Sequence, residues 1–225
     1  MDVESIKTLR KALVAVGRRI YDKGFVAAND GNISVRVDES RILISPTGVS
    51  KGFMKPESMV VTDMQGNPLR GEGKPSSEVR LHLTVYKERP DISAVCHAHP
   101  VTATAFASAG IPLDRPILPE VIISIGAIPL VPYGTPGTDE LADPLLEFLP
   151  NHDAFLLSHH GALTLGKDIW TAYHRMETLE HFALILHAAM SLGPVPSLKQ
   201  NEVQALLSQR KKWGIRSDLG PYPKS

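Results

Sequence analysis

The chain has 225 residues, of which 43% are hydrophobic and 21% are charged, values typical of a protein with a buried core. Its 24 basic and 24 acidic side chains balance, which argues against partners recognised by bulk charge, such as nucleic acid or an anionic membrane. The single cysteine, Cys96, excludes an intramolecular disulfide and favours a reducing compartment. The N-terminus is acidic and has no apolar signal core, and no stretch approaches the ~20 apolar residues of a membrane span. These features predict a cytoplasmic protein.

The periodicity of apolar residues predicts strands and helices that alternate irregularly along the chain. In chain order we expect a helix at 3–23, strands at 33–37, 41–45 and 59–62, a helix at 78–87, a strand at 94–97, a helix at 101–109, short strands at 121–124 and 129–131, a helix at 138–149, a strand at 154–157 that continues through 162–165 after Gly161, and helices at 169–192 and 200–213. No internal repeat and no linker is found. The sequence therefore predicts a single α/β domain of the α+β type over residues 1–225, with a central, mostly antiparallel sheet flanked by helices and a flexible tail from about residue 217.

Two histidines follow an apolar run in the segment Ala94-Val95-Cys96-His97-Ala98-His99-Pro100. Side chains at positions i and i+2 of a strand point to the same face, so His97 and His99 should aim at one point, as two ligands of a metal site do. His160 lies in a similar setting, at the end of a buried strand and directly before a glycine. His159 competes with it, but neighbouring residues of a strand face opposite ways, so only one of the pair should ligate. The other histidines, His82 among them, have no supporting pattern.

Three polar loops offer hydroxyl groups, amides or free backbone donors. They surround Asn32, Thr47-Gly48 and Ser76-Ser77, and the third opens the helix at 78–87 with a serine as its N-cap. Each loop on its own is consistent with an ordinary surface turn. The three together suggest a cup for a phosphate group.

Glu78 is the candidate acid/base group, because it lies at the end of the Ser-Ser loop in the first turn of the helix. The competing interpretation is that it only satisfies the preference of a helix N-terminus for negative charge. A divalent metal, a phosphate cup and a carboxylate together fit enolate chemistry on a phosphorylated sugar. The metal polarises a ketone, the carboxylate moves the proton of the enediolate, and the phosphate loops position the reacting carbons.

The chain resembles the class II aldolase/adducin family, and most closely its fuculose-1-phosphate aldolase branch. Five segments carry the resemblance, in the family's order and spacing, and together they are highly specific. They are Gly31-Asn32-Ile33-Ser34, Ser45-Pro46-Thr47-Gly48, Pro75-Ser76-Ser77-Glu78, His97-Ala98-His99 and His159-His160-Gly161.

This resemblance implies a zinc-dependent aldolase that cleaves a ketose 1-phosphate reversibly to dihydroxyacetone phosphate and an aldehyde. It implies His97, His99 and His160 as ligands of one divalent metal per chain, Zn²⁺ first and Mn²⁺ or Co²⁺ as alternatives, and Glu78 as the catalytic acid/base. It also implies a homotetramer with active sites at subunit interfaces. The residues that it implies as phosphate binders are Asn32, Thr47, Gly48, Ser76 and Ser77.

Two positions depart from the family pattern. The aldolase branch has a tyrosine near Glu120, contributed by the neighbouring subunit, and another where this chain has Trp213. Neither hydroxyl is present, so Glu120 is a candidate second acid/base group or a contact of the aldehyde tail. The change favours a less polar aldehyde fragment, such as that of a 5-deoxy or methylthio pentulose 1-phosphate.

Three alternatives stay open. A pentulose-5-phosphate 4-epimerase shares the scaffold, but its branch carries aspartate at the position of Glu78. A methylthioribulose-1-phosphate dehydratase also uses three histidines. An adducin-like binding domain keeps the fold without catalysis, and the intact histidines and Glu78 argue against it.

Overall fold

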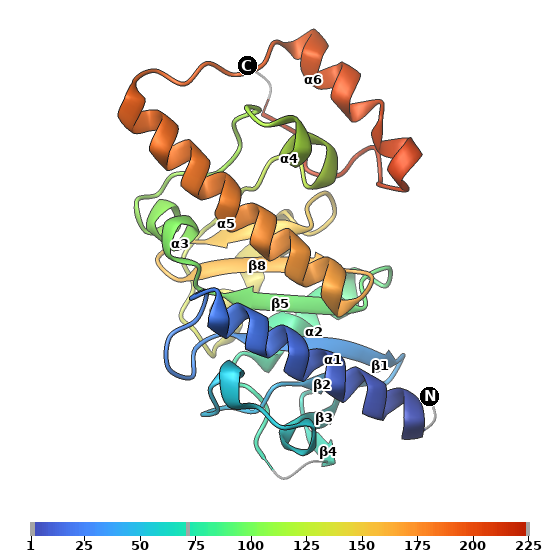
Figure 1. The fold of residues 1–225 in the computed structure, drawn as a ribbon. Coiled ribbons are helices and arrows are strands. Elements are labelled where there is room, and N and C mark those ends of the chain that lie inside the picture. The colour runs from blue at the N-terminus through green and yellow to red at the C-terminus, as the bar shows by residue number, and fades with distance from the viewer. Residues whose placement is uncertain (1–2, 71–72, 224–225) are drawn as a thin grey trace.

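An eight-stranded sheet runs through the molecule, and helices cover both of its faces (Figure 1). The computed structural model describes residues 3–70 and 73–223. The strand order is β4-β3-β2-β1-β5-β8-β7-β6, and every neighbouring pair is antiparallel except β6 with β7. The strands are β1 (Asn32–Asp38), β2 (Arg41–Ile44), β3 (Val60–Asp63), β4 (Pro68–Arg70), β5 (Ala94–Ala98), β6 (Leu130–Val131), β7 (Ala154–Leu157) and β8 (Gly161–Gly166). This confirms the predicted fold class.

Three helices cover one face of the sheet: α1 (Val3–Asp22), α3 (Val101–Ser108) and α5 (Ile169–Leu192). The opposite face is covered by α2 (Val79–Glu88) and by two 3₁₀ turns, η3 (Asp139–Leu141) and η4 (Asp143–Glu147). A separate hydrophobic cluster fills each of the two interfaces. The remaining elements are η1 (Lys51–Phe53) and η2 (Pro56–Ser58) beside α1, and α4 (Pro119–Ser124), α6 (Gln200–Leu207) and η5 (Arg210–Trp213).

The alternation of β1 explains how the two faces differ. Ile33, Val35 and Val37 are buried in the cluster beneath α1 and α5. Asn32 and Ser34 therefore point to the other face, toward α2, because successive side chains of a strand alternate. This places polar groups of β1 in a buried layer between the sheet and α2.

The segment predicted as a strand at 121–124 is instead the helix α4. Its Val-Ile-Ile run favours a strand by local preference, but Pro119 supplies a good first helical residue. The end of the helix is fixed from far along the chain, because the buried Arg210 guanidinium donates to the carbonyl groups of Ile122 and Ile123. That contact satisfies carbonyls that a helix end leaves without partners.

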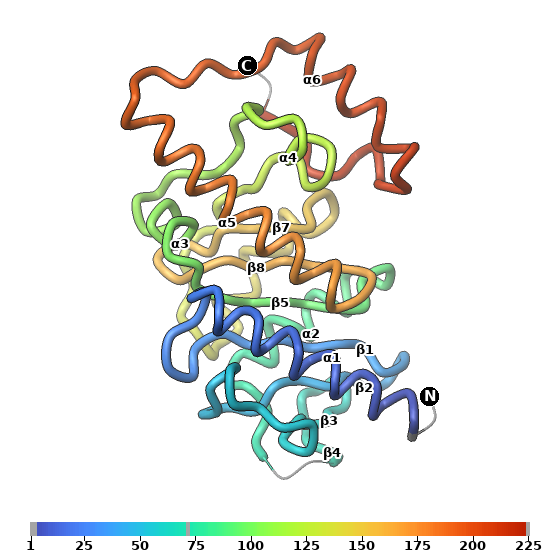
Figure 2. Tube along the Cα trace, in the orientation of Figure 1, coloured from blue at the N-terminus to red at the C-terminus, as the bar shows by residue number. Residues whose placement is uncertain are grey.

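The prediction that residues 162–165 continue the strand at 154–157 is also wrong. Residues 158–160 form a turn, and β8 runs back antiparallel to β7, with Leu157 opposite Gly161 (Figure 2). Gly161 is needed at this point, because a Cβ there would lie 2.6 Å from the carbonyl oxygen of Ala98 and 2.6 Å from the ring of His99.

Other differences concern helix regularity and a short edge strand. The helix predicted at 138–149 is broken into η3 and η4, since Pro144 has no N–H to donate within a helix. The helix predicted at 200–213 is divided into α6 and η5. The strand β4 was not predicted at all.

The expected C-terminal tail begins with packed residues. Leu219 is buried, and the backbone of Gly220 accepts a hydrogen bond from Ala127 and donates one to Asn151. Residues 224–225, at the end of that tail, lie outside the described residues. Across the described ranges, the structure has no helix with the length and apolar character needed to cross a membrane.

Candidate active site

Three strand ends bring His97, His99 and His160 to one point. His97 lies in β5, and His99 directly follows the last residue of β5, with its backbone N–H bonded to the carbonyl of Phe25. His160 ends the turn between β7 and β8. The neighbouring His159 adopts a positive φ of 55° and is exposed, so its side chain is separated from the cluster.

The three imidazole rings face one another closely. Their centroids are 4.7 to 5.0 Å apart, and one nitrogen from each ring lies within 4.8 Å of the others. Nε2 of His97 is 3.1 Å from Nε2 of His99. Such a close approach of nitrogen atoms is the geometry of a ligand set.

The protonation of His97 fits a cation. Its Nδ1 lies 2.9 Å from the carbonyl oxygen of Ala162 and can only donate to it, so Nε2 carries a lone pair directed into the cluster. Burial lowers the pKa of His97, and burial also lowers the pKa of His99, so both rings are neutral at pH 7. Neutral imidazole is the form that ligates metals. The three residues could therefore hold a divalent metal ion.

Glu78 lies directly against this cluster. It is only 8% exposed, and its carboxylate oxygens are 3.4 Å from Nε2 of His97 and 3.2 Å from Nε2 of His160. Asn32 donates a hydrogen bond of 2.6 Å to the same carboxylate. Burial acts to raise the pKa of Glu78, but the neighbouring His97 and His160 and the bond from Asn32 outweigh it and lower that pKa. Glu78 is thus held ionised as an acceptor, and it is the N-cap residue of α2 in place of the expected serine.

The loops predicted to bind phosphate converge beside Glu78. Two backbone hydrogen bonds join the loop around Thr47-Gly48 to the loop around Ser76-Ser77. Thr47 donates to the carbonyl of Lys74, and Ser76 donates to the carbonyl of Ser45. Ser76 is buried and its hydroxyl accepts from the N–H of Glu78. The exposed members of the set are Thr47, Gly48 and Ser77. Asn32, Ser76 and Glu78 are therefore adjacent, with exposed donors beside them.

Lys51 joins two of these loops, and the sequence pattern did not reveal it. The residue is buried, and its Nζ donates to the carbonyl groups of Asn29 and Val49. Burial lowers its pKa to about 8. The bonds fix the segment before Asn32 relative to the segment after Gly48.

A second missed residue is His82, which lies fully buried in α2. One of its ring nitrogens contacts the side-chain oxygen of Asn32 and the other contacts the hydroxyl of Ser34. The signal that could have found it is its spacing, four residues after Glu78 on the same face of the helix.

Glu120 and Trp213 do not join the site within one chain. Glu120 is exposed in the first turn of α4, and Trp213 is 71% exposed in η5. Neither side chain has a described contact with the histidine cluster. Whether they reach the site of a neighbouring subunit stays a prediction.

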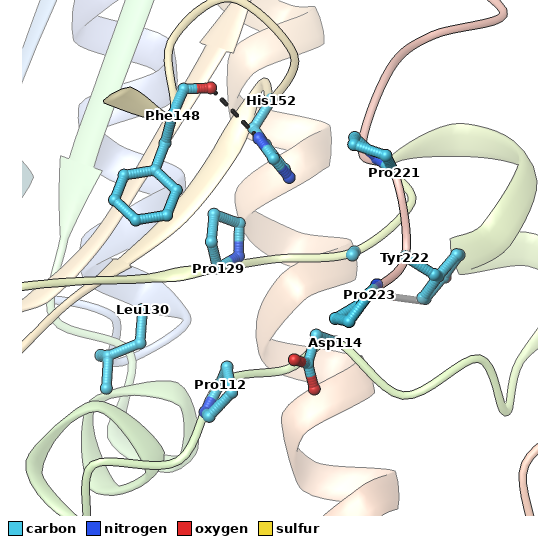
Figure 3. Close-up of a pocket in the computed structure, with 10 residues that line it drawn as sticks. Pro112, Asp114, Pro129, Leu130, Phe148, His152, Pro221, Tyr222 and Pro223 are labelled. Carbon is cyan, nitrogen blue, oxygen red and sulfur yellow. Dashed lines mark hydrogen bonds between the residues drawn. The ribbon is translucent and has the colours of Figure 1, made fainter. Parts of the chain in front are cut away.

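A separate cavity of about 420 Å³ lies beside the start of β7, away from His160, which follows the end of that strand. Phe148 and His152 border it on one side and residues 221–223 of the C-terminal segment border it on the other (Figure 3). Its lining is mostly proline and other apolar residues. It has no part in the histidine site.

The chain is similar to several proteins of known family. Residues 11–187 match the model of the class II aldolase and adducin N-terminal domain. An L-fuculose phosphate aldolase from Methanococcus maripaludis is 38% identical over 170 residues, covering 76% of this chain and 91% of that protein. A 3-oxo-tetronate 4-phosphate decarboxylase from Haemophilus influenzae is 36% identical over 179 residues, covering 77% and 84%. A 5-deoxy-D-ribulose 1-phosphate aldolase from Bacillus thuringiensis serovar kurstaki is 33% identical over 207 residues, covering 91% and 96%.

A solved structure of L-fuculose 1-phosphate aldolase superposes with a TM-score of 0.84 at 29% identity, covering 92% of this chain and 97% of that one. The family match covers most of the chain, and the relatives align over most of their own length. The chain therefore belongs to the class II aldolase and adducin family.

Proposed function

We propose that this protein is a class II aldolase that cleaves a 5-deoxypentulose 1-phosphate reversibly into dihydroxyacetone phosphate and an aldehyde. One observation carries the proposal. A buried carboxylate, Glu78, lies 3.2 and 3.4 Å from two of three clustered imidazoles and borders loops with exposed hydroxyl and backbone donors. The 5-deoxy substrate is supported by the relative of that name, which aligns with 91% of this chain.

The histidines would hold the metal, Zn²⁺ in the first instance, through His97, His99 and His160. A divalent ion at that point supplies polarisation of the substrate ketone and neutralises the negative charge of the enediolate. Glu78 moves the proton. In the synthetic direction the ionised Glu78 carboxylate removes a proton from C3 of dihydroxyacetone phosphate. In cleavage the carboxylate first takes up a proton from the solvent. When the bond between C3 and C4 then breaks, its electron pair stays on C3, and Glu78 donates that proton to this carbon.

The phosphate loops position the substrate. Asn32, Thr47, Gly48, Ser76 and Ser77 would donate to the phosphate oxygens, while Glu78 stays within reach of the carbon next to the ketone. Binding at the phosphate orients the reacting carbons before the bond breaks.

Decarboxylation is the second candidate, and the relative from Haemophilus influenzae favours it. Loss of CO₂ from a four-carbon 3-oxo acid 4-phosphate leaves the same three-carbon enediolate, and its protonation again gives dihydroxyacetone phosphate. The reactions differ in the leaving fragment. An aldehyde leaves only when a base removes its hydroxyl proton, whereas CO₂ needs no such base. Glu120 is our candidate for that base, reaching the site from a neighbouring subunit of a homotetramer.

The products of four substrates separate the candidates. Protein loaded with Zn²⁺ is incubated with 5-deoxy-D-ribulose 1-phosphate, L-fuculose 1-phosphate, 3-oxo-tetronate 4-phosphate or a pentulose 5-phosphate. We expect dihydroxyacetone phosphate and acetaldehyde from the first. Release of CO₂ from the oxo acid alone would replace the aldolase by a decarboxylase, and interconversion of pentulose 5-phosphates would replace it by an epimerase. Conversion of none of them would overturn the proposal.

Replacement of Glu120 tests the leaving-group base. Glu120→Gln is expected to slow aldehyde release and to leave any CO₂ release unchanged, since only the first reaction needs the base. Equal turnover of the ketose 1-phosphate by Glu120→Gln and wild type would remove Glu120 from the reaction. Light scattering of both proteins checks that the assembly, expected to be a tetramer, is the same.

A further inference from the structure

A line of buried polar side chains connects the protein core with Glu78. The Tyr86 hydroxyl lies 2.7 Å from the Ser34 hydroxyl, and Ser34 lies 2.6 Å from Nδ1 of His82. Nε2 of His82 lies 2.5 Å from the side-chain oxygen of Asn32, and the Asn32 amide nitrogen donates to Glu78 over 2.6 Å. All five residues are less than 9% exposed. The line therefore runs without solvent between its members.

The line exists because two periodicities match. Glu78, His82 and Tyr86 are four residues apart on one face of α2, where four residues advance by about 6 Å. Asn32 and Ser34 are two residues apart on one face of β1, where two residues advance by about 6.8 Å. Because the two spacings are nearly equal, successive residues on this face of α2 lie next to successive residues on this face of β1. These hydrogen bonds form because α2 packs on β1, and each of them joins residues that are far apart in the sequence.

Only one arrangement of hydrogen atoms satisfies every member. A carboxylate oxygen of Glu78 accepts from the amide nitrogen of Asn32, so the side-chain oxygen of Asn32 faces His82. Nε2 of His82 must then carry the hydrogen, and Nδ1 must accept from the hydroxyl of Ser34, which in turn accepts from Tyr86. Burial lowers the pKa of His82 to about 4, which keeps the ring neutral at pH 7.

The structure assigns His82 a positioning role: we propose that its Nε2–H fixes the orientation of the Asn32 amide, and through Asn32 the position of the Glu78 carboxylate. This inference rests on the proposed acid/base role of Glu78. Without the donor from His82, the Asn32 amide is free to turn its oxygen toward Glu78, which sets two acceptors against each other. His82 contacts neither the three histidines of the cluster nor, in the proposed reaction, the substrate.

Paired substitutions separate positioning from packing. His82→Leu fills the space but has no donor, whereas His82→Gln keeps a side-chain N–H that can reach Asn32. For His82→Leu we expect kcat to fall by about 10- to 100-fold, the usual cost of losing a partner that orients a functional group, with a smaller change in KM. For His82→Gln we expect most of that turnover to return. His152→Leu, a half-buried histidine at the start of β7, is the matched control and should keep wild-type turnover.

A nuclear magnetic resonance measurement tests the arrangement without any turnover. In ¹⁵N-labelled metal-free protein at pH 7, the ring nitrogen signals of His82 are identified as those absent from His82→Gln. We expect them to be the signals of a neutral imidazole that carries its hydrogen on Nε2. The side-chain amide signals of Asn32 should shift in His82→Leu and stay in place in His152→Leu. If the protein converts none of the four substrates, the proposed function fails. The spectrum still shows which nitrogen of His82 carries the hydrogen and whether His82 orients the Asn32 amide.

Three results would overturn the inference. One is a ring of His82 that carries its hydrogen on Nδ1 or is doubly protonated at pH 7. Another is turnover of His82→Leu within about twofold of wild type, which is less than the loss of an orienting partner costs. The third is an equal loss in His82→Leu and His82→Gln that follows their melting temperatures, which is what a purely structural residue would give.

Discussion

Two clusters of buried titratable side chains lie at opposite ends of β5 and β7, and they are built in contrasting ways. Where these strands begin, Asp153 accepts from Arg89 over 2.9 Å and from Arg175 over 2.8 Å. The guanidinium groups also donate to carbonyl groups, Arg89 to Leu149 and Arg175 to Leu165. Each buried charge in this cluster therefore faces an opposite charge.

Where the strands end, the histidine cluster has no such balance. Three imidazoles approach one another, and the partner of two of them is a carboxylate that would also reach a metal ion. Nitrogen atoms of the three rings converge there, and the described contacts of the cluster include no lysine or arginine. The contrast separates a cluster that stabilises the fold from one arranged to receive a ligand.

Glu78→Gln should give the largest effect on function. The substitution keeps the size of the side chain but cannot take up or release the proton, and such steps contribute typically ~10²–10⁴-fold to a rate. We expect turnover with the preferred substrate to fall by that amount while circular dichroism and melting temperature stay close to wild type.

The control for this substitution is Glu88→Gln, an exposed acid in the last turn of the same helix. It should leave turnover unchanged. Wild-type rates in Glu78→Gln would assign the proton transfer to another group.

Asp153→Asn should break the structural cluster instead. Removing one partner of a buried ion pair typically costs about 3–5 kcal/mol, because it leaves buried charge uncompensated. Here Arg175 would lose its carboxylate partner, and Arg89 would keep only Asp91. Denaturant unfolding measures that loss, and turnover per folded molecule should change little. Asp91→Asn is the matched control, since the Asp91 side chain is 50% exposed and an exposed pair with Arg89 contributes about 1 kcal/mol or less. Equal losses in the two variants would contradict the structural role of the buried charge.

Acid should reveal the buried position of His82. The unfolded chain binds a proton at His82 near its ordinary pKa of 6.5, whereas the folded chain binds it only near pH 4. As the pH falls from about 6.5 to 4, the free energy of unfolding therefore decreases, by on the order of 3 kcal/mol from this residue. His82→Leu lacks that decrease, so the difference in unfolding free energy between wild type and variant should become smaller toward pH 4. Parallel curves of unfolding free energy against pH would show that His82 is not buried in the neutral form.

The sequence predicts the centre of the sheet well because its signals there are local. The alternating residues of β1, the apolar run of β5 and the turn residues before Asn32 each indicate their own structure. The i and i+2 spacing of His97 and His99 also predicts that the two side chains meet, as they do.

Other features depend on partners far along the chain. The helix α4 overrides its strand-like Val-Ile-Ile run because Arg210, almost 90 residues later, binds its last carbonyl groups. The reversal between β7 and β8 depends on the positive φ of His159 and on the space that Gly161 leaves for His99. His82 has no pattern of its own and gains its contacts only when α2 packs on β1. Local periodicity contains none of these contacts.

We propose that His97, His99 and His160 hold the metal on which activity depends. The most direct test measures metal content and turnover together while a chelator removes the metal from purified protein. We predict about one divalent ion per chain, the stoichiometry of a catalytic site, with activity falling in proportion to the ion removed and returning when Zn²⁺ is added. Metal-free protein that keeps full activity would contradict the account.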